Sequence, residues 1–546
     1  MTRRPAPADL RLLPPALAAW LASWFGLTLP PLFSVAAAAV FLLLGAFGLL
    51  RCRRRVLSHP LDLPPSAVSV YTALLVGAGF AASGALHLLA VQAGPVPQLA
   101  HQSAMVGAVL TVTGDPRRIV LNRPGAIGSA SPRPGSAARP AWSRNDQDLL
   151  LIPARMNEVS ASGATYAVRS VVTMFVYVGK SPSPTDRRWL DLLPSTAISV
   201  RGRLAEALPG TGESAVLKAA KGAPIVVGRP SVLQSAAGRL RADLRAAVAG
   251  LPAEPAGLLP ALAVGDTSRE PPELADAFKA TGLTYLTVVS GENLVFCSIA
   301  LLPLVRWAGV RGRAVPLAGA VLALGFTAVA RPGPPMVRAT VMALFAATAS
   351  ITGRRFRALP VMAAAVLVLL WYDPWLAHEY GFVLSVAATA GLLILSPGWH
   401  GRLADRGVPD WAAVAISATA AAEVFCEPLL VTFTGQLPLL AVVCNVAAVP
   451  AAPVATVLGV AAMLGAAVWL PLGHVIAWLG QWPVRWICLV AETGSAVPGA
   501  VLPWPRGALG GLLLVANYVL IAYFAGVDFR QTVTKARLDK QKVSSV

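Results

Sequence analysis

Apolar runs of about 20 residues recur along this chain, and a helix of that length can cross about 30 Å of hydrocarbon. Of the 546 residues, 56% are hydrophobic and only 13% are charged, and the mean hydropathy is +0.64. Soluble globular proteins carry about a quarter charged residues. The sequence therefore predicts a polytopic α-helical membrane protein with about 10–12 spans, some of them broken or re-entrant.

Residues 1–100 hold three apolar segments, at 12–29, 31–50 and 66–92. Pro30 and Pro31 separate the first two segments, which predicts a tight helical hairpin. Basic clusters stand on both sides of this hairpin, at Arg3 and Arg4 and in RCRRR at 51–55. The positive-inside rule places both clusters in the cytoplasm, so the third segment should carry the chain to the outer face.

Residues 101–230 lose the long apolar runs and gain short runs rich in β-branched residues. These runs are MVGAVLTVTG, RRIVLN, YAVRSVVTMFVYVG and TAISVRGRLAEALPG. Glycine, proline, serine and asparagine separate them, which favours a small antiparallel β-barrel or sandwich on the extracytoplasmic side. In residues 231–255, leucine and valine recur at helical spacing among several arginines, which predicts an amphipathic helix at the membrane surface.

Positive charge is concentrated in this outward block. The chain has a net charge of +19, and residues 101–250 hold 19 lysines and arginines against 9 aspartates and glutamates. One interpretation is that these are ordinary basic anchors of a membrane protein. The positive-inside rule would enrich cytoplasmic loops instead, so an outward excess favours contact with a phosphate backbone. The arginines expected to bind DNA are Arg117, Arg118, Arg201, Arg203, Arg239, Arg241 and Arg245.

Residues 256–526 return to membrane-like composition and form the predicted channel domain. The clusters RWAGVRGR (306–313) and GRRFR (353–357) are separated by two spans, so both should face the cytoplasm. The basic tail at 527–546 is also cytoplasmic if the segment near 437–450 is re-entrant rather than spanning.

Several polar residues interrupt the apolar runs of this channel domain. Such residues are costly inside a membrane, and glycine or proline beside them indicates broken helices around water or protein. We expect them to line a hydrated path, with Arg338 facing a wet cavity or a carboxylate; the alternative is a set of buried structural ion pairs. The expected path residues are Asp266, Ser290, Gly291, Glu292, Asn293, Arg338, Glu379, Gly381, Ser385, Asn445 and Pro450.

The order of the motifs around these residues resembles the ComEC family of competence proteins. The motifs are ALAVGD, FKATGLTYLTVVSGENL, RPGPPMVRATVM, DPWLAHEYGFVLSVAATAGL and LPLLAVVCNVAAVPAAP, within about 255–470. The resemblance implies a multi-pass channel in the cytoplasmic (inner) membrane that carries single-stranded DNA during natural transformation, with residues 101–230 as an OB-like domain. It also implies a DNA receptor protein and a cytoplasmic motor ATPase as partners, since no GxxxxGK[ST] motif is present. Homo-oligomerisation stays open.

Two departures from the family pattern limit what can be carried over. Many relatives have histidines where this chain has Tyr285 and Asn293, so titration of a histidine cannot be part of this site. Many relatives also carry a metallo-β-lactamase-like domain, whereas the six histidines here include no HxH pair. We therefore expect no metal, no cofactor and no catalytic residue, and any nuclease should be a separate protein.

Two rival interpretations remain. The same broken helices would suit a small-solute or lipid transporter, although that function has no need of a basic outer domain. An intramembrane serine hydrolase would need Ser290 beside a base such as His378 or His474. The stretch HEYGF resembles the start of HExxH, but Phe382 replaces the second zinc ligand.

Overall fold

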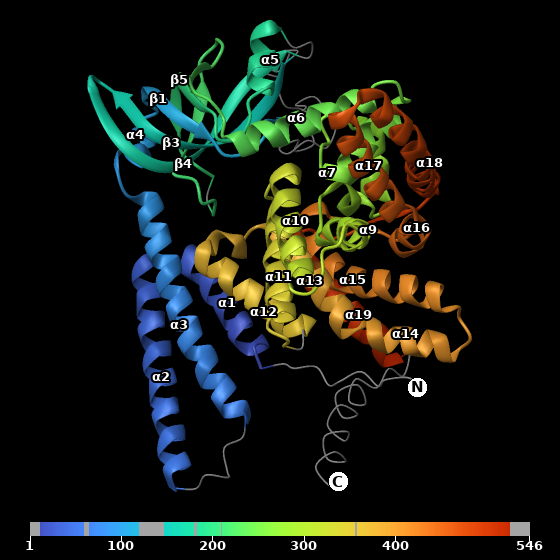
Figure 1. Ribbon diagram of the computed structural model, residues 1–546. Helices are drawn as coiled ribbons and strands as arrows, with labels where there is room; N and C mark the ends of the chain where they lie inside the picture. The colour runs from blue at the N-terminus through green and yellow to red at the C-terminus, as the bar shows by residue number, and fades with distance from the viewer. Residues whose placement is uncertain are drawn as a thin grey trace, which may run out of the picture. The chain divides into compact units, whose positions relative to one another are not determined.

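The computed structural model describes residues 11–58, 65–119, 147–179, 183–208, 210–354 and 357–524. The chain divides into two compact units, which we describe separately (Figure 1). The sheet unit comprises Ala22–Val40 and Gly79–Arg239. The helical unit comprises Met1–Leu21, Phe41–Ala78 and Leu240–Val546.

The three predicted N-terminal segments are helices. They are α1 (Leu13–Thr28), α2 (Pro31–Ser58) and α3 (Pro65–Gln92). Helix α1 ends before Pro30 and α2 begins at Pro31, where the missing N–H of proline leaves no donor unsatisfied. A Cβ on Gly26 would lie 3.2 Å from the carbonyl oxygen of Ala81, so the small residue lets the end of α1 approach α3 closely.

Seven strands form one mixed sheet in the sheet unit (Figure 1). They are β1 (Met105–Val112), β2 (Arg117–Ile119), β3 (Gln147–Ala161), β4 (Ala164–Gly179), β5 (Ala197–Ala205), β6 (Ala215–Ala219) and β7 (Ile225–Gly228). Strand β1 pairs with both β3 and β5, and the pairings run from β1 through β3, β4, β6 and β5 back to β1. Strands β2 and β7 extend β3 and β5.

The expectation of an all-antiparallel set is wrong at one pairing, since β4 and β6 are parallel. After β4 the chain passes through α5 (Pro184–Leu190), and β5 then pairs with β1 rather than with β4. Strand β6 runs antiparallel to β5, so it returns beside β4 in the same direction as β4.

Successive side chains along each strand point alternately inward and outward, which separates an apolar interior from a polar exterior. On β5, Ile198 and Leu204 are fully buried, whereas Arg201 and Arg203 are exposed. The interior also holds fully buried side chains from β1, β3, β4 and β6, and α4 (Pro95–His101) contributes the fully buried Val96. A Cβ on Gly202 would collide with the carbonyl oxygen of Lys218, so only glycine permits this approach of β5 to β6.

Helices make up nearly all of the helical unit. Besides parts of α1, α2 and α3, its elements are the second half of α6 (Val232–Ala247), then α7 (Ala253–Val264), α8 (Pro272–Ala280), η2 (Thr284–Thr287), α9 (Gly291–Trp307), α10 (Ala314–Ala330), α11 (Pro334–Ile351), α12 (Ala358–Tyr372), η3 (Pro374–Ala377), α13 (Tyr380–Ile394), α14 (Ser396–Asp405), α15 (Asp410–Thr434), β8 (Gln436–Pro438), α16 (Ala441–Ala448), α17 (Ala451–Val468), α18 (Leu470–Ser495), β9 (Val501–Pro503) and α19 (Gly507–Phe524). The first half of α6 belongs to the sheet unit.

Five described stretches are long and apolar enough to cross a membrane. They are Pro31–Gly48, Ser69–Gln92, Pro334–Ile351, Asp410–Thr434 and Ala451–Val468. Helices α13 and α14 add a sixth if the pair, bent by 42°, forms one span. Four further apolar helices are shorter: α7, α10, α12 and the Gly507–Ile521 part of α19. The described part of the chain is therefore mostly helical and has several candidate membrane spans, consistent with a multi-pass membrane protein.

The segment near 437–450 is too short to cross a membrane alone. Helix α16 has 8 residues, and a helix of that length is about 12 Å long, less than half the hydrocarbon thickness. Strand β8 precedes it and pairs with β9. The re-entrant path of this segment stays a prediction. The expected basic tail at 527–546 lies outside the described residues.

Candidate functional site

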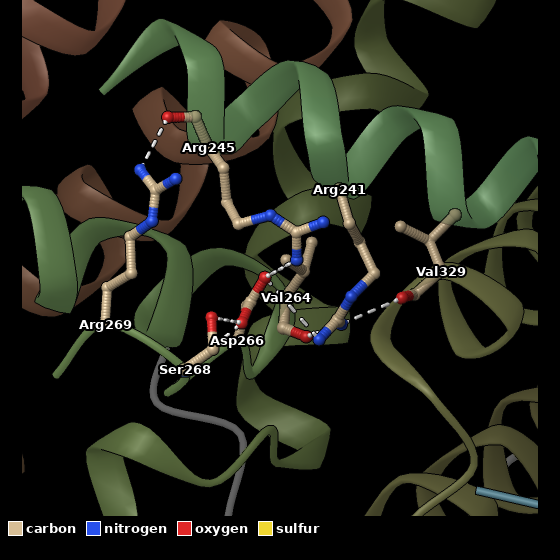
Figure 2. Close-up of polar contacts among 7 residues, drawn as sticks. All are labelled: Arg241, Arg245, Val264, Asp266, Ser268, Arg269 and Val329. Carbon is tan, nitrogen blue, oxygen red and sulfur yellow. Dashed lines mark hydrogen bonds and ion pairs between the residues drawn. The ribbon is translucent and has the colours of Figure 1, made fainter. Parts of the chain in front are cut away.

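Asp266 lies in a buried polar cluster at the end of α7 (Figure 2). The helix ends at Gly265, whose φ of 69° is left-handed and suits glycine. The next side chain, Asp266, is only 4% exposed. Its Oδ2 lies 2.9 Å from Nη1 of Arg245 and 3.8 Å from Nη2 of Arg241. Its Oδ1 accepts a hydrogen bond of 2.6 Å from the hydroxyl of Ser268.

The arginines of α6 fasten several segments of the helical unit together. Arg241 is 7% exposed and donates to the carbonyl oxygens of Val264 at 2.8 Å and Val329 at 3.2 Å (Figure 2). Arg269 donates to the carbonyl oxygen of Arg245 at 3.1 Å. Sequence reasoning placed Asp266 in the channel and Arg241 and Arg245 on a DNA surface, but the structure joins all three in one ion cluster.

The cluster holds Asp266 ionised. Burial alone would raise the pKa of Asp266, but the charge of Arg241, the hydroxyl of Ser268 and the charge of Arg245 together outweigh it. The pKa of Asp266 therefore lies below its ordinary value. Arg241 and Arg245 thus neutralise the ionised carboxylate of Asp266. Arg239 lies on the other half of α6 and is exposed.

The Ser-Gly-Glu-Asn stretch forms the start of α9. The hydroxyl of Ser290 caps the helix by accepting from the backbone N–H of Glu292 at 3.2 Å. Asn293 is buried, and its Nδ2 donates to the carbonyl oxygen of Leu262 on α7 at 2.8 Å. A Cβ on Gly291 would lie 2.8 Å from Cβ of Ala339 on α11. Through these contacts the start of α9 packs between α7 and α11, while the Glu292 side chain remains exposed.

Arg338 and Ser385, both expected in the path, contact each other. Arg338 on α11 is 5% exposed, and its Nε and Nη2 donate to the hydroxyl of Ser385 on α13 at 3.0 and 2.9 Å. Its Nη1 lies 2.9 Å from the sulfur of Met342. Among the described residues no carboxylate lies within ion-pair distance of Arg338. In the described part of the chain its positive charge is therefore held by neutral groups rather than by a carboxylate, one of the two expected environments; the expected wet cavity stays a prediction.

Asn445 on α16 contacts one of two glutamates on α15 that sequence reasoning missed. It is fully buried, and its Nδ2 donates to Oε1 of Glu423 on α15 at 3.0 Å. Glu427, one turn further along α15, is 4% exposed. The missed signal was two carboxylates four residues apart in an apolar segment of 25 residues, because ionisable residues in a span are functional candidates.

The remaining path residues occupy helix starts. Glu379 precedes the first residue of α13 and is exposed, and Pro450 precedes α17. A Cβ on Gly381 would lie 3.5 Å from Cδ of Pro335, so the first turns of α13 and α11 are adjacent. The structure thus joins the expected residues as pairs and small groups, not as one continuous lining.

Two cavities in the described residues lie away from these groups. One of about 700 Å³ is lined by Arg306, Arg311 and Arg313 with neighbouring apolar residues. A smaller one of about 220 Å³ is lined by Arg402, Arg406 and residues of α15. Neither is lined by a residue of the expected path.

A row of outward-facing side chains crosses the sheet unit. The strand register pairs Met105 with Arg203, Arg203 with Lys218, Lys218 with Phe175, Phe175 with Leu151 and Leu151 with Arg117. Residues paired in this way point to the same face. We call these six residues the basic row. Its three cations are exposed, and Phe175 and Leu151 are half-buried.

Some of the arginines expected to bind DNA belong to the basic row or lie beside it, and others do not. Arg117 and Arg203 belong to it, and Arg201 follows on the same exposed face of β5. Arg118 instead donates to Oδ2 of Asp148 at 2.7 Å. Sequence reasoning missed Lys218 and Phe175, because only strand register places them beside Arg203.

No group of three or more histidine, cysteine, aspartate or glutamate side chains among the described residues could hold a metal. The hydroxyl of Ser290 contacts Glu292 and Asn293, and Nε2 of His474 lies 3.2 Å from the carbonyl oxygen of Ala246. Ser290 therefore has no histidine contact in the described part of the chain.

Comparison with known proteins agrees with the motif order. The family model described as competence protein matches residues 262–528. Competence protein ComA of Neisseria gonorrhoeae is 28% identical over 260 residues, which cover 46% of this chain and 36% of that protein. ComE operon protein 3 of Bacillus subtilis (strain 168) is 27% identical over 147 residues, covering 27% of this chain and 19% of that protein.

The match thus covers 36% of the length of one curated relative and 19% of the other. No solved structure matches it. The matched region begins within α7 and contains the starts of α9, α11 and α13, where the polar groups described above are gathered. Residues 262–528, just under half of the chain, thus carry a competence protein domain.

Proposed function

We propose that this chain carries single-stranded DNA across the cytoplasmic membrane during natural transformation, and that its sheet unit binds the strand first. The family assignment supports a role in DNA uptake. The observation that carries the proposal is the basic row, because it combines exposed cations with an aromatic ring on one outward face.

The chemistry of the basic row suits single-stranded DNA. Arg203 and Lys218 are direct neighbours on adjacent strands, which are about 4.8 Å apart, so their charges reinforce each other at one phosphate track. Phe175 follows Lys218 in the row and offers a ring on which a base could stack. Such stacking is worth about 1–3 kcal/mol per base and tolerates any sequence.

The strand pairings support an OB-like barrel for this domain. Five strands pair in a ring, β4 and β6 are parallel, and α5 connects β4 to β5. OB-folds are five-stranded Greek-key barrels that bind oligonucleotides on the face of their second and third strands. In the ring these strands are β3 and β4, which carry Leu151 and Phe175.

The helical unit would form the passage through the membrane. The six candidate spans and the four shorter apolar helices would together reach ten, and α9 or α18 would extend the set to the expected 10–12. Broken helices are compatible with a membrane where their free backbone groups face protein or water. The bend between α13 and α14 and the short α16 are such breaks.

Arg338 is the group in this passage best suited to a phosphate. The arginines around Asp266 are neutralised by its carboxylate, whereas Arg338 is held by a hydroxyl and a thioether. A passing phosphate would replace Ser385 and gain a charged donor. The weak neutral partners would then re-form the bond as the strand moves on, since conduction needs sites that release what they bind.

The proposal requires partners that this chain does not supply. The sheet unit would lie on the extracytoplasmic side, where a DNA receptor protein would deliver the strand. A cytoplasmic motor ATPase would draw it inward, and a separate nuclease would remove the other strand. We propose no cofactor and no catalysis by this chain. The two contacts of the Ser290 hydroxyl, neither of them a histidine, support transport over serine hydrolysis.

Binding of a labelled single-stranded oligonucleotide to the full-length protein in nanodiscs tests the proposal. We expect binding with little sequence preference that weakens steeply with salt. Arg203→Glu with Lys218→Glu should weaken binding and reduce the magnitude of the log–log salt slope by about 0.7 for each lost phosphate contact. Phe175→Ala should weaken binding with little change in slope.

The matched control is Arg169→Glu. Arg169 is exposed on β4, six residues before Phe175, which is about 20 Å along the strand. It reverses one charge away from the basic row, as each of the two substitutions in the row does, and should leave binding nearly unchanged. Binding that is independent of salt, or an equal loss in the control variant, would refute the assignment and favour a small-solute or lipid transporter.

A further inference from the structure

Two carboxyl groups of one candidate span have no cationic partner among the described residues. Glu423 and Glu427 stand one turn apart on α15, whose segment Asp410–Thr434 is a candidate span. Residues four apart face the same side of a helix. Their Cβ atoms are therefore about 5–6 Å apart, which lets the two carboxyl groups approach each other. Among the described residues, no lysine, arginine or histidine pairs with either of them.

The buried polar atoms around this pair are incompletely satisfied. Glu423 accepts one hydrogen bond, from Nδ2 of Asn445 at 3.0 Å. In the described part of the chain, neither oxygen of Glu427 has a hydrogen-bond donor, although the residue is only 4% exposed. The Oδ1 atom of Asn445, a fully buried side chain, likewise has no partner there. Unsatisfied buried polar atoms are rare in folded proteins, so a group of them at one point calls for an occupant.

Two ionised carboxylates are not stable in this arrangement. Two like unit charges about 4 Å apart repel by about 4 kcal/mol at an effective dielectric constant of about 20, before the cost of burying either charge is included. Two carboxylates also cannot hydrogen-bond each other, because both only accept. One proton on the pair removes one charge and supplies the missing O–H donor between them.

The surrounding titratable groups do not supply a compensating charge. Tyr285 on η2 and Tyr518 on α19 interact electrostatically with the pair, and Cys426 lies between its two members on α15. Glu292 on α9 also interacts with Tyr285 and is itself acidic. None of these groups carries a positive charge in any protonation state, so the balancing cation has to come from solution.

We propose that Glu423, Glu427 and Asn445 form a cation-binding site inside the helical unit, and that its occupant is one proton shared by the two carboxyl groups. A proton needs only the two carboxyl oxygens that already approach each other, whereas a sodium ion would need several oxygens arranged around it. Asn445 fixes Glu423 through Nδ2, so it acts as a positioning residue. The site goes beyond DNA transport and does not depend on it.

Infrared difference spectroscopy of the full-length protein in detergent tests the proposal directly. At pH 7 the wild type should show the C=O stretch of a protonated, buried carboxylic acid, with a small shift in heavy water. Glu423→Gln and Glu427→Gln should each remove this band, because the glutamine amide can donate to the remaining carboxylate. The matched control Glu379→Gln, at an exposed position, should retain it.

Further outcomes distinguish the occupant. Potentiometric titration should find one bound proton fewer per chain at pH 7 in either glutamine variant than in the wild type. Size-exclusion chromatography and circular dichroism establish that each variant is folded, and the two single variants serve as alternatives to one another. The absence of the band in the wild type, or its persistence in both variants, would overturn the proposal. Loss of the band on adding sodium at constant pH, but not potassium, would overturn the proton as occupant.

Discussion

Replacing Asp266 by asparagine tests the ion cluster that holds α6 on α7. The substitution keeps the size of the side chain and its bond from Ser268, but it removes the negative charge. Arg241, whose side chain is 8% exposed, then stays buried without a counter-charge. Removing one partner of a buried ion pair costs about 3–5 kcal/mol.

The lower end of that range applies here. Arg241 keeps its hydrogen bonds to the carbonyl oxygens of Val264 and Val329, and the side chain of Arg245 is 35% exposed and can turn to water. We therefore expect a loss of about 3 kcal/mol in the free energy of unfolding. At about 2 °C per kcal/mol for a large domain, the apparent Tm should fall by about 6 °C.

Thermal unfolding of the full-length protein in detergent, followed by tryptophan fluorescence, measures this loss. Arg241→Gln should cost a similar amount, and the double variant should lose clearly less than the sum of the two, because the two groups interact directly. Asp243→Asn is the matched control, since Asp243 lies on α6, the helix of Arg241, and has no ion pair or hydrogen bond in the described part of the chain. An Asp266→Asn variant that unfolds with the wild type, or strict additivity in the cycle, would refute the reasoning.

Three further results are expected. Because the pKa of Asp266 is lowered in the folded state, its ionised carboxylate stabilises the protein fully at neutral pH, and this stabilisation disappears as the pH falls through and below about 4. The Tm of the wild type should therefore drop more between about pH 5 and pH 3 than the Tm of Asp266→Asn. A Cβ on Gly391 of α13 would collide with the carbonyl oxygen of Ala421 on α15, so Gly391→Ala should lower the free energy of unfolding by about 1–3 kcal/mol. The control Gly325→Ala, in open space on α10, should not lower the Tm. Arg338→Gln should reduce transformation about tenfold or more, as expected for about 1.4 kcal/mol of lost phosphate binding. It should not lower the Tm, because no carboxylate loses a partner. Normal DNA uptake by this variant would remove Arg338 from the path.

Local features of the fold were predictable from the sequence. Hydropathy and the Pro30–Pro31 break predicted the first three helices, because a long apolar run has few alternatives in a membrane, although α2 continues to Ser58, beyond the predicted end at residue 50. The alternation in TAISVRGRLA gave β5 and placed Arg201 and Arg203 outside. The parallel pairing of β4 with β6 was missed, since it depends on β5 crossing to β1, a contact that no local pattern encodes.

The polar groups were found more readily than their partners. Asp266, Arg241 and Arg245 each stood out in the sequence, but only the path of α6 over the end of α7 makes them one cluster. Glu423 and Glu427 were missed although their spacing in an apolar span was visible. Lys218 and Phe175 could not be chosen, because single exposed residues on strands acquire meaning only through register.

Site-specific photocrosslinking during uptake tests the central claim most directly. A benzoylphenylalanine introduced at Phe175, at Ser290 or at the exposed control position Leu324 would be illuminated while cells take up labelled DNA. We expect single-stranded DNA adducts at positions 175 and 290 and none at 324. DNA uptake that proceeds normally with an adduct at Phe175 but none at Ser290 would contradict passage through the helical unit.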